Sequence, residues 1–223
     1  MSNCIYLDIG NSNAKWKYEG EFFRVPTAKF NLDNLPEASK IWISNVSNDF
    51  KFSNKSNISL VESQKRYKSL INSYKEPHML GSARWLSMIA SYEINSSKNF
   101  MVVDIGTAVT FDLVNNSGLH MGGSIFPGLL KIRNTFEHFL VSKEFKINKL
   151  SQSTQDAWSS GTLELIVNGI NQKIHNIKQV EPDINIFLTG GGFQDVKIFL
   201  DFSYVYHENL VLDGLELFVN NMG

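Results

Sequence analysis

Two short segments of this chain place a carboxylate, a glycine and hydroxyl side chains directly after a run of apolar residues. Asp8 follows residues 4–7 and precedes Gly10, Asn11 and Ser12, while Asp104 follows residues 100–103 and precedes Gly106 and Thr107. The apolar runs are typical of buried strands, and a second strand is predicted after each turn. A carboxylate there can hold a metal ion or another cation, and the turn's N–H groups and hydroxyls can bind phosphate oxygens. This strand–turn–strand unit therefore suits a triphosphate.

The two Asp-Ile-Gly copies are 96 positions apart (104 − 8). A repeat of this length is the size of a domain, so it predicts two halves of like fold that face each other across a cleft. A simpler interpretation also fits, in which each carboxylate only caps the turn of an ordinary hairpin.

Two positive charges lie where they could meet an anion. Lys15 is close in sequence to the first Asp-x-Gly turn, and Arg84 begins a predicted helix whose possible N-cap is Ser82. A cation beside the free N–H groups of a helix start makes an anion site. Each charge also has an ordinary interpretation, because Lys15 could lie on a solvated strand face and Arg84 on the exposed surface.

Glycine-rich segments follow two later strands, at residues 122–123 and at residues 190–192. Glycines at such points let the backbone approach a ligand closely, although paired glycines also occur in bulged hairpins. His120 stands just before the first segment without a cluster of partners in the sequence, so we expect it to be structural.

The composition bounds the class of protein. The chain has 223 residues, a formal net charge of −1 and 43% hydrophobic residues, which supports a sizeable core and argues against binding to nucleic acid. A single cysteine, Cys4, excludes an internal disulfide framework and fits a reducing compartment. No signal peptide or membrane span is expected, so a cytoplasmic location is predicted.

The predicted elements describe an α/β protein with a mixed sheet in each half. The two halves are predicted to be domains of residues 1–98 and 99–223. Residues 62–80 lack clean periodicity. Helices are predicted to begin near residue 82, to run over 129–140 and 193–200, and to extend from 154 to 180. The last of these carries a long apolar stripe from Leu163 to Ile177, which is either core or a subunit interface.

Together these motifs resemble the type III pantothenate kinases, a family of the actin, heat-shock chaperone and sugar kinase superfamily. The resemblance is carried in order by Asp-x-Gly-Asn-Ser at residues 8–12, Asp-x-Gly-Thr-Ala at 104–108, Gly-Gly-x-Ile-x-Pro-Gly at 122–128 and a late Thr-Gly-Gly at 189–191. It implies two ribonuclease-H-like domains, a homodimer, and ATP in the cleft between the domains.

The resemblance also implies the reaction and its residues. ATP would phosphorylate the hydroxyl of pantothenate to give 4'-phosphopantothenate, the first step towards coenzyme A, with a divalent cation such as magnesium. Asp104 would coordinate a monovalent cation, potassium or ammonium. The implied ATP contacts are Asp8, Gly10, Asn11, Ser12, Lys15 and Thr107; the implied pantothenate contacts are Tyr74, Gly81, Ser82, Arg84 and Thr154.

The chain departs from the family at one chemically important position. The family has Gly-x-Asp-Arg where this chain has Gly81-Ser82-Ala83-Arg84, and the missing Asp is the family's general base. A general base contributes about 10²–10⁴-fold, whereas phosphoryl transfer depends mostly on positioning and charge stabilisation. The alanine therefore predicts a slow kinase. It fits equally a natural variant, an engineered substitution, or a member retained only for binding.

Three functions remain open at this point. The first is pantothenate kinase, with activity lowered by Ala83. The second is a non-catalytic protein that binds nucleotide or pantothenate and regulates a partner. A different small-molecule kinase of the same superfamily fits less well, because Tyr74, Arg84 and Thr154 all match. A P-loop kinase is excluded, since the chain lacks Gly-x-x-x-x-Gly-Lys-Ser/Thr.

Overall fold

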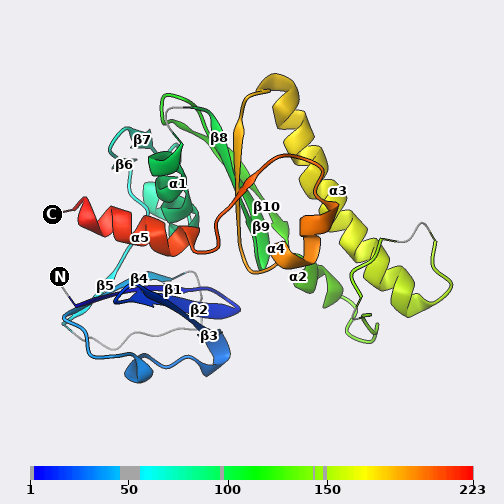
Figure 1. The fold of residues 1–223 in the computed structure, drawn as a ribbon, viewed down its shortest axis with the longest axis horizontal. Coiled ribbons are helices and arrows are strands. Elements are labelled where there is room, and N and C mark those ends of the chain that lie inside the picture. Colours follow the sequence, from blue (N-terminus) through cyan, green and yellow to red (C-terminus); the bar gives the residue numbers. More distant parts are fainter. Residues whose placement is uncertain (1–2, 46–55, 96–97, 143, 148–149, 223) are drawn as a thin grey trace. The chain divides into compact units, whose positions relative to one another are not determined.

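A computed structural model describes residues 3–45, 56–95, 98–142, 144–147 and 150–222. Contacts divide the chain into two compact units (Figure 1). Unit 1 comprises Met1–Ser97, Val114–Gly122 and Asn209–Gly223, and unit 2 comprises Lys98–Leu113 and Gly123–Glu208. The chain thus first crosses between units beside the predicted boundary at 98/99, but its last helix groups with unit 1.

Unit 1 is built on a five-stranded mixed sheet in the order β3-β2-β1-β4-β5. The strands are β1 (Cys4–Ile9), β2 (Asn13–Tyr18), β3 (Glu21–Pro26), β4 (Lys40–Asn45) and β5 (Ile58–Leu60). β1–β2 and β2–β3 are antiparallel, whereas β1–β4 and β4–β5 are parallel. Alternate residues of β1 and β4 are buried in one apolar cluster with the loop that contains the 3₁₀ turns η1 (Thr27–Lys29) and η2 (Leu32–Asn34).

Two helices of unit 1, α1 (Ser82–Ile94) and α5 (Leu210–Asn220), pack against each other and contact this sheet. Lys17 on β2 forms a 2.6 Å ion pair with Glu216 on α5. The helices meet so closely that a Cβ added at Gly214 would lie 1.9 Å from the carbonyl oxygen of Leu86. This backbone contact fixes how α5 lies on α1.

Unit 2 contains the second five-stranded sheet, in the order β10-β9-β8-β11-β12. Its strands are β8 (Phe100–Ile105), β9 (Ala108–Val114), β10 (His120–Pro127), β11 (Asn185–Thr189) and β12 (Val205–Tyr206). β11 is parallel to both β8 and β12. The shorter elements are the helices α2 (Leu129–Arg133) and α4 (Phe193–Val196) and the 3₁₀ turn η4 (Lys197–Phe199).

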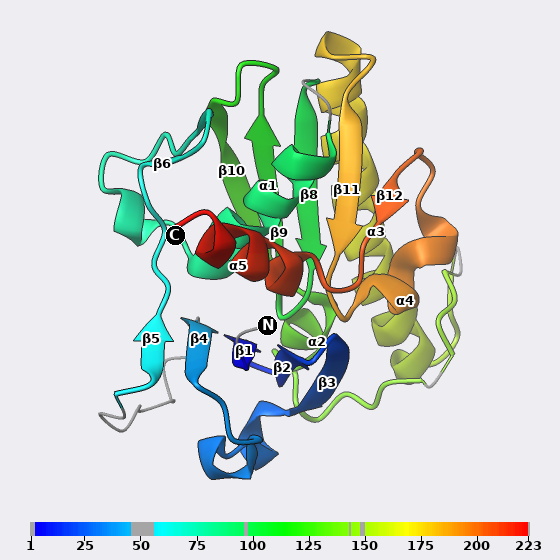
Figure 2. The ribbon, with the colours of Figure 1, turned by 60° about the vertical axis from the view of Figure 1, so that its left-hand side comes forward.

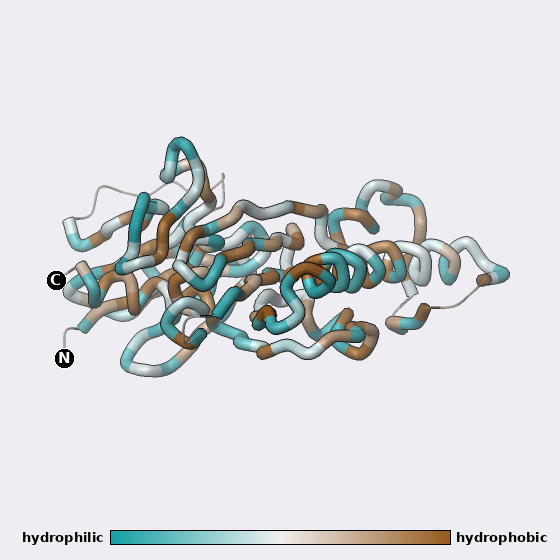
Figure 3. Tube along the Cα trace, turned by 90° about the horizontal axis from the view of Figure 1, so that it is seen from above, coloured by the Kyte–Doolittle hydropathy of each residue, from teal (hydrophilic) through white to brown (hydrophobic). Residues whose placement is uncertain are grey.

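The long helix α3 (Thr154–Val180) runs along the unit 2 sheet (Figure 2). Hydrophobic and hydrophilic residues alternate along it, as expected for an amphipathic helix (Figure 3). Its stripe residues Leu163, Ile166, Val167, Ile170 and Ile174 are buried in one cluster with β8, β9 and β11. The stripe is therefore core of unit 2, and its length is not evidence for a subunit interface.

The predicted α/β fold with a mixed sheet in each half is confirmed, but the predicted end of one helix and the predicted N-cap of another are wrong. The helix expected over 129–140 ends at Arg133. The region 62–80 contains a small hairpin of β6 (Arg66–Tyr67) and β7 (Leu70–Ile71) and the 3₁₀ turn η3 (Pro77–Met79). Gly81, not Ser82, is the N-cap of α1, because the Ser82 hydroxyl bonds to Ser44 instead. Within the described ranges, no helix is both long and apolar enough to cross a membrane.

We predict that Gly214→Ala lowers the free energy of unfolding by about 1–3 kcal/mol, because the new methyl group would overlap backbone of α1. Gly161→Ala, in α3, is the matched control. Nothing lies within 4 Å of a Cβ at that position, so only helix propensity changes, and stability should rise by up to about 1 kcal/mol. Chemical denaturation measures both variants. Equal effects of the two substitutions would contradict the close α1–α5 contact.

Candidate active site

The turn between β8 and β9 is held from three sides by backbone hydrogen bonds. The Gly106 N–H donates to the Ala108 carbonyl across the turn at 2.9 Å. The Gly128 N–H, just before α2, donates to the Thr107 carbonyl at 2.9 Å, and the Gly192 N–H, just before α4, donates to the Ile105 carbonyl at 2.8 Å. Two separate segments of unit 2, at Gly128 and Gly192, therefore converge on the turn at residues 104–108.

Glycine is required where these segments meet. A Cβ at Gly128 would lie 2.1 Å from the carbonyl oxygen of Gly106, and one at Gly190 would lie 2.3 Å from Oδ1 of Asp104. Gly190 also has φ +101°, a conformation that residues with a side chain rarely adopt. The glycine-rich segment at 190–192, which the sequence connected with nucleotide binding, thus packs directly behind the Asp104 carboxylate.

The side chains of Asp104 and Thr107 are half-buried in this turn. A carboxylate next to backbone carbonyls offers the hard oxygen ligands that potassium or magnesium prefers. In the part of the chain that the structure describes, no group of three or more His, Cys, Asp or Glu could hold a metal ion. A cation at Asp104 would therefore need backbone or substrate oxygens to complete its shell. The donor chemistry fits a cation that accompanies a phosphate better than a protein-only metal site.

The equivalent turn in unit 1, between β1 and β2, is closed in a similar way. The Gly10 N–H donates to the Asn13 carbonyl at 3.0 Å, and the Thr27 hydroxyl donates to the Gly10 carbonyl at 2.7 Å. Asn11 and Ser12 are exposed at its tip. The turn therefore holds its backbone rigidly and presents polar side chains outward.

Asp8 lies in a row of polar side chains across the unit 1 sheet. It is paired with Lys15 on β2 and with Ser44 on β4, and directly paired residues point to the same face of a sheet. The Ser44 and Ser82 hydroxyl oxygens are 3.0 Å apart, so this face leads to the start of α1. Sequence reasoning missed Ser44, and only strand pairing could have revealed it.

Tyr74 and Arg84, both implied pantothenate contacts, lie side by side in the structure. Arg84 Nη1 donates to the Tyr74 hydroxyl at 3.0 Å, and the guanidinium lies 5.8 Å from the centre of the Tyr74 ring. Both side chains are half-buried. Gly81 is the N-cap of α1 without a side-chain cap, which leaves the first N–H groups of the helix beside the arginine. This corner of unit 1 therefore suits a carboxylate.

Two residues that the sequence did not single out as functional hold Tyr74 in place. The side chain of Asn72 is fully buried; its Oδ1 accepts from the Tyr74 N–H at 3.0 Å, and its Nδ2 donates to the carbonyls of Gln64 and Pro77. The ring of His120 stacks on Tyr74 with centroids 6.0 Å apart. His120 is buried, as a structural residue would be, but the sequence did not reveal these partners.

The remaining predicted residues are Ala83 and Thr154. Ala83 is half-buried between Ser82 and Arg84 at the start of α1 and brings no titratable group there. Thr154 is the exposed first residue of α3, just after Ser153, whose hydroxyl caps the helix by accepting from the Asp156 N–H. Thr154 belongs to unit 2, whereas Tyr74, Ser82 and Arg84 belong to unit 1.

A buried arginine supports the segment that follows Gly128. Arg133 Nε donates to the Thr162 hydroxyl at 3.1 Å and Nη2 donates to the Ser159 carbonyl at 2.9 Å, which ties the end of α2 to α3. Burial lowers the pKa of Arg133. Burial raises the pKa of Asp195, in α4, while the charge of Arg133 opposes that rise. The arginine thus acts as an internal anchor for α2.

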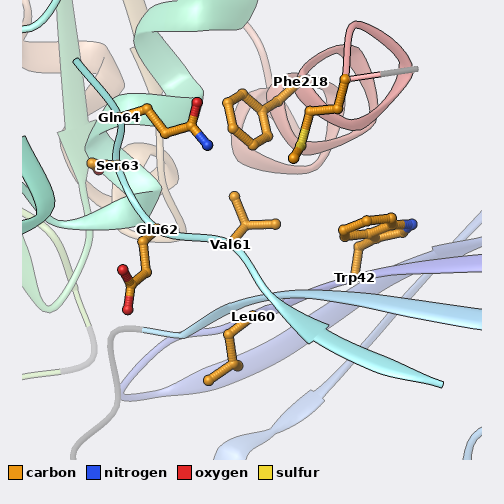
Figure 4. Close-up of a pocket in the computed structure, with 8 residues that line it drawn as sticks. Trp42, Leu60, Val61, Glu62, Ser63, Gln64 and Phe218 are labelled. Atoms are coloured by element: carbon orange, nitrogen blue, oxygen red, sulfur yellow. The ribbon is translucent and has the colours of Figure 1, made fainter. Parts of the chain in front are cut away.

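Unit 1 also contains a cavity of about 240 Å³ between β4, residues 60–64 and α5. Val61 and Phe218 point toward each other across it, and Trp42 lies to one side (Figure 4). None of the predicted site residues lines this cavity. It is therefore separate from the Tyr74–Arg84 corner.

The known proteins that this chain resembles in sequence share one description. The sequence model of a family described as type III pantothenate kinase matches residues 4–176. The chain belongs to this family. A type III pantothenate kinase of Alcanivorax borkumensis is 26% identical over 95% of this chain and 96% of its own length, and one of Campylobacter jejuni is 28% identical over 95% and 94%. One of Hahella chejuensis is 35% identical over 69% of this chain and 64% of its own length.

Solved structures give the same fold. A Campylobacter jejuni protein named for the Baf family of transcriptional activators superposes with a TM-score of 0.68 at 26% identity, and covers 98% of both chains. A protein named for 2-dehydro-3-deoxygalactonokinase from Sinorhizobium meliloti has a TM-score of 0.62 at 11% identity, covering 97% of this chain and 95% of its own. The second likeness shows the fold alone, and together they confirm the predicted actin-like kinase fold class.

Proposed function

We propose that this protein transfers the γ-phosphoryl group of ATP to the hydroxyl of pantothenate, giving 4'-phosphopantothenate for coenzyme A synthesis. The observation that carries the proposal is the Tyr74–Arg84 pair at the start of α1, in a chain that belongs to the type III pantothenate kinase family. Pantothenate is a carboxylate with a hydroxyl group. The guanidinium and the free N–H groups of α1 suit the carboxylate, and the turns at Asp8 and Asp104 suit the phosphates.

Each residue has a role in this proposal. Asp8, Gly10, Asn11, Ser12, Lys15 and Thr107 contact ATP; Tyr74, Gly81, Ser82, Arg84 and Thr154 contact pantothenate. Asp104 contributes a carboxylate oxygen to a potassium or ammonium ion. A divalent cation such as magnesium, bound with ATP, neutralises charge on the transferred group. We keep the cytoplasmic location as part of the proposal, since the single cysteine, Cys4, is free.

Ala83 limits the rate in this proposal. The chain cannot accept the hydroxyl proton at position 83, so the reaction depends on alignment and charge stabilisation alone. Binding of both substrates is unaffected by the alanine, because a general base acts on the transition state. The enzyme is therefore a slow kinase with an intact substrate site.

A second function is favoured by the same alanine. A protein that binds nucleotide or pantothenate without turnover, and so reports their level to a partner, needs every feature described above except the base. The structurally similar Campylobacter jejuni protein is named for a family of transcriptional activators, which is in keeping with a regulatory alternative. Turnover separates the two functions.

We predict that Ala83→Asp raises kcat by about 10²–10⁴-fold while the affinity for ATP stays nearly constant. The helix start favours a carboxylate, so the fold should not be destabilised. A coupled assay of ATP consumption, with and without pantothenate in potassium buffer, measures both proteins, and Ile94→Asp, at the exposed far end of α1, controls for a carboxylate added elsewhere on the helix. A variant no faster than the parent would show that position 83 is not the base site.

For the cation, we predict that Asp104→Asn abolishes the response to potassium and raises the KM for ATP. Gly190→Ala should also raise the KM for ATP, since its methyl group would overlap both the Asp104 carboxylate and the Ile105 carbonyl. Gly122→Ala is the matched control, because this glycine also has positive φ but has open space around its Cβ position. If Asp104→Asn keeps the parent's dependence on potassium, Asp104 does not bind the cation.

We also propose a homodimer, built on an aromatic cluster beside the start of α3. The ring centroids of Phe136 and Phe139 lie 5.3 and 5.4 Å from that of Trp158. The buried indole N–H of Trp158 has no hydrogen-bond partner among the described residues. Phe136 is 48% exposed and the nearby Leu140 is 72% exposed. A second copy of the chain would cover this apolar surface.

In sedimentation at micromolar concentration we expect the parent to be a dimer and Leu140→Arg to be a monomer, because the charge would be buried in the interface. Val180→Arg, at the exposed far end of α3, should stay dimeric. A monomeric parent would reject the dimer. A dimeric Leu140→Arg would place the interface elsewhere.

A further inference from the structure

The tip of the β9–β10 hairpin is fixed against the segment that carries Tyr74. A Cβ at Gly118 would lie 2.6 Å from the Ser69 carbonyl oxygen, and Gly118 has φ +82°, so the backbones touch at a point where only glycine fits. The Ile71 N–H donates to the Gly118 carbonyl at 2.8 Å, and Ile71 and Leu119 form a parallel bridge. These contacts place His120, the residue after Leu119, beside residues 73–74.

His120 makes two contacts with that segment. Its ring stacks on Tyr74, with an interplanar angle of 15° and centroids 6.0 Å apart, and its Nδ1 lies 3.4 Å from the Ser73 hydroxyl. The side chain of His120 is fully buried. One face of the Tyr74 ring is therefore defined by a residue that arrives from a hairpin about 46 positions later in the chain (120 − 74).

The stacked ring decides where the Tyr74 hydroxyl stands. A tyrosine ring can turn about its side-chain bonds, but a stacked neighbour removes that freedom, and Asn72 fixes the Tyr74 backbone through its N–H. The Tyr74 hydroxyl in turn accepts the Arg84 Nη1 hydrogen bond at 3.0 Å. The chain of contacts runs from His120 to Tyr74 to Arg84, the group that meets the substrate carboxylate.

We infer that His120 is a positioning residue, which sets the affinity for pantothenate by holding the Tyr74 hydroxyl against Arg84. The inference rests on the proposed function and deepens it. Because Ala83 supplies no base, catalysis here depends more than usual on alignment, and the stacked histidine is a device for alignment. His120 itself touches no reacting atom in this account.

The test is a double-mutant cycle on turnover, with KM and kcat measured separately for pantothenate and ATP. An aromatic contact of ordinary strength corresponds to roughly 2- to 10-fold in a dissociation constant, so His120→Ala should raise the KM for pantothenate by about that factor. The KM for ATP should stay within about 2-fold. In the Tyr74→Phe background, which has no hydroxyl to hold, His120→Ala should change the KM for pantothenate by less than about 2-fold.

Two further variants separate positioning from simple support of the fold. His120→Phe keeps a stacked ring and should retain most of the affinity. His175→Ala, at an exposed histidine whose Nε2 lies 3.0 Å from Oδ1 of Asp201, should leave both KM values unchanged. If His120→Ala unfolds below the assay temperature, the two KM values are measured for His120→Phe and Ser73→Ala instead. Equal effects of His120→Ala in the parent and Tyr74→Phe backgrounds, or equal rises in both KM values, would overturn the inference.

The same variants are titrated with pantothenate alone by calorimetry, which separates this inference from the proposed function. A parent that binds pantothenate without turnover rejects the kinase but leaves the cycle measurable in dissociation constants. If the parent phosphorylates pantothenate but the effects of His120→Ala and Tyr74→Phe are additive, only the role of His120 is rejected. A parent that neither binds nor phosphorylates pantothenate rejects both.

Discussion

Backbone lies directly against backbone around the β8–β9 turn, and the proposed phosphate and cation chemistry of unit 2 depends on that contact. Side chains at positions 128 and 190 would overlap the turn or its carboxylate, so glycine there sets how closely three segments can converge. The contact holds the Asp104 carboxylate and the carbonyls of Ile105 and Thr107 close together without using any side chain to fill the space. The N–H groups of Gly106, Gly128 and Gly192 already donate to backbone carbonyls, so the close contact supplies a rigid turn around Asp104 and no free donors of its own.

In unit 1, side chains and not backbone contacts fix the position of the proposed binding groups. The proposed pantothenate corner combines a helix start, an arginine and a tyrosine. Ser44 holds Ser82, and Asn72 and His120 hold Tyr74. Such a site is specific because its polar groups already have partners and fixed positions before a ligand arrives. In the proposed function, the alanine at position 83 slows the chemical step and leaves substrate binding unchanged.

Much of this could be predicted from the sequence. Period-two and helical patterns identified both sheets and the 27-residue α3, and the two Asp-x-Gly turns lie where strands end, as expected. The prediction failed where tertiary contacts override local pattern. Phe136 and Phe139 share helical spacing with Leu129, yet α2 ends at Arg133 and the two rings pack on Trp158 instead. His120 had no local partner, because its partners are 46–47 positions away along the chain (120 − 74 and 120 − 73). From the sequence alone, the apolar stripe of α3 could belong to the core or to a subunit interface. Its packing against the unit 2 sheet shows that it belongs to the core.

The central claim is that a chain with Ala83 still moves phosphate from ATP to pantothenate. The most direct measurement is a single-turnover experiment with enzyme in excess over ATP labelled at the γ-phosphate, in potassium and magnesium, with pantothenate present or omitted. Excess enzyme makes even a slow reaction visible, because each protein needs to act only once. The account predicts that the label appears in 4'-phosphopantothenate, slowly and only when pantothenate is present. Label that remains in ATP, or that reaches only inorganic phosphate at the same rate without pantothenate, would contradict it.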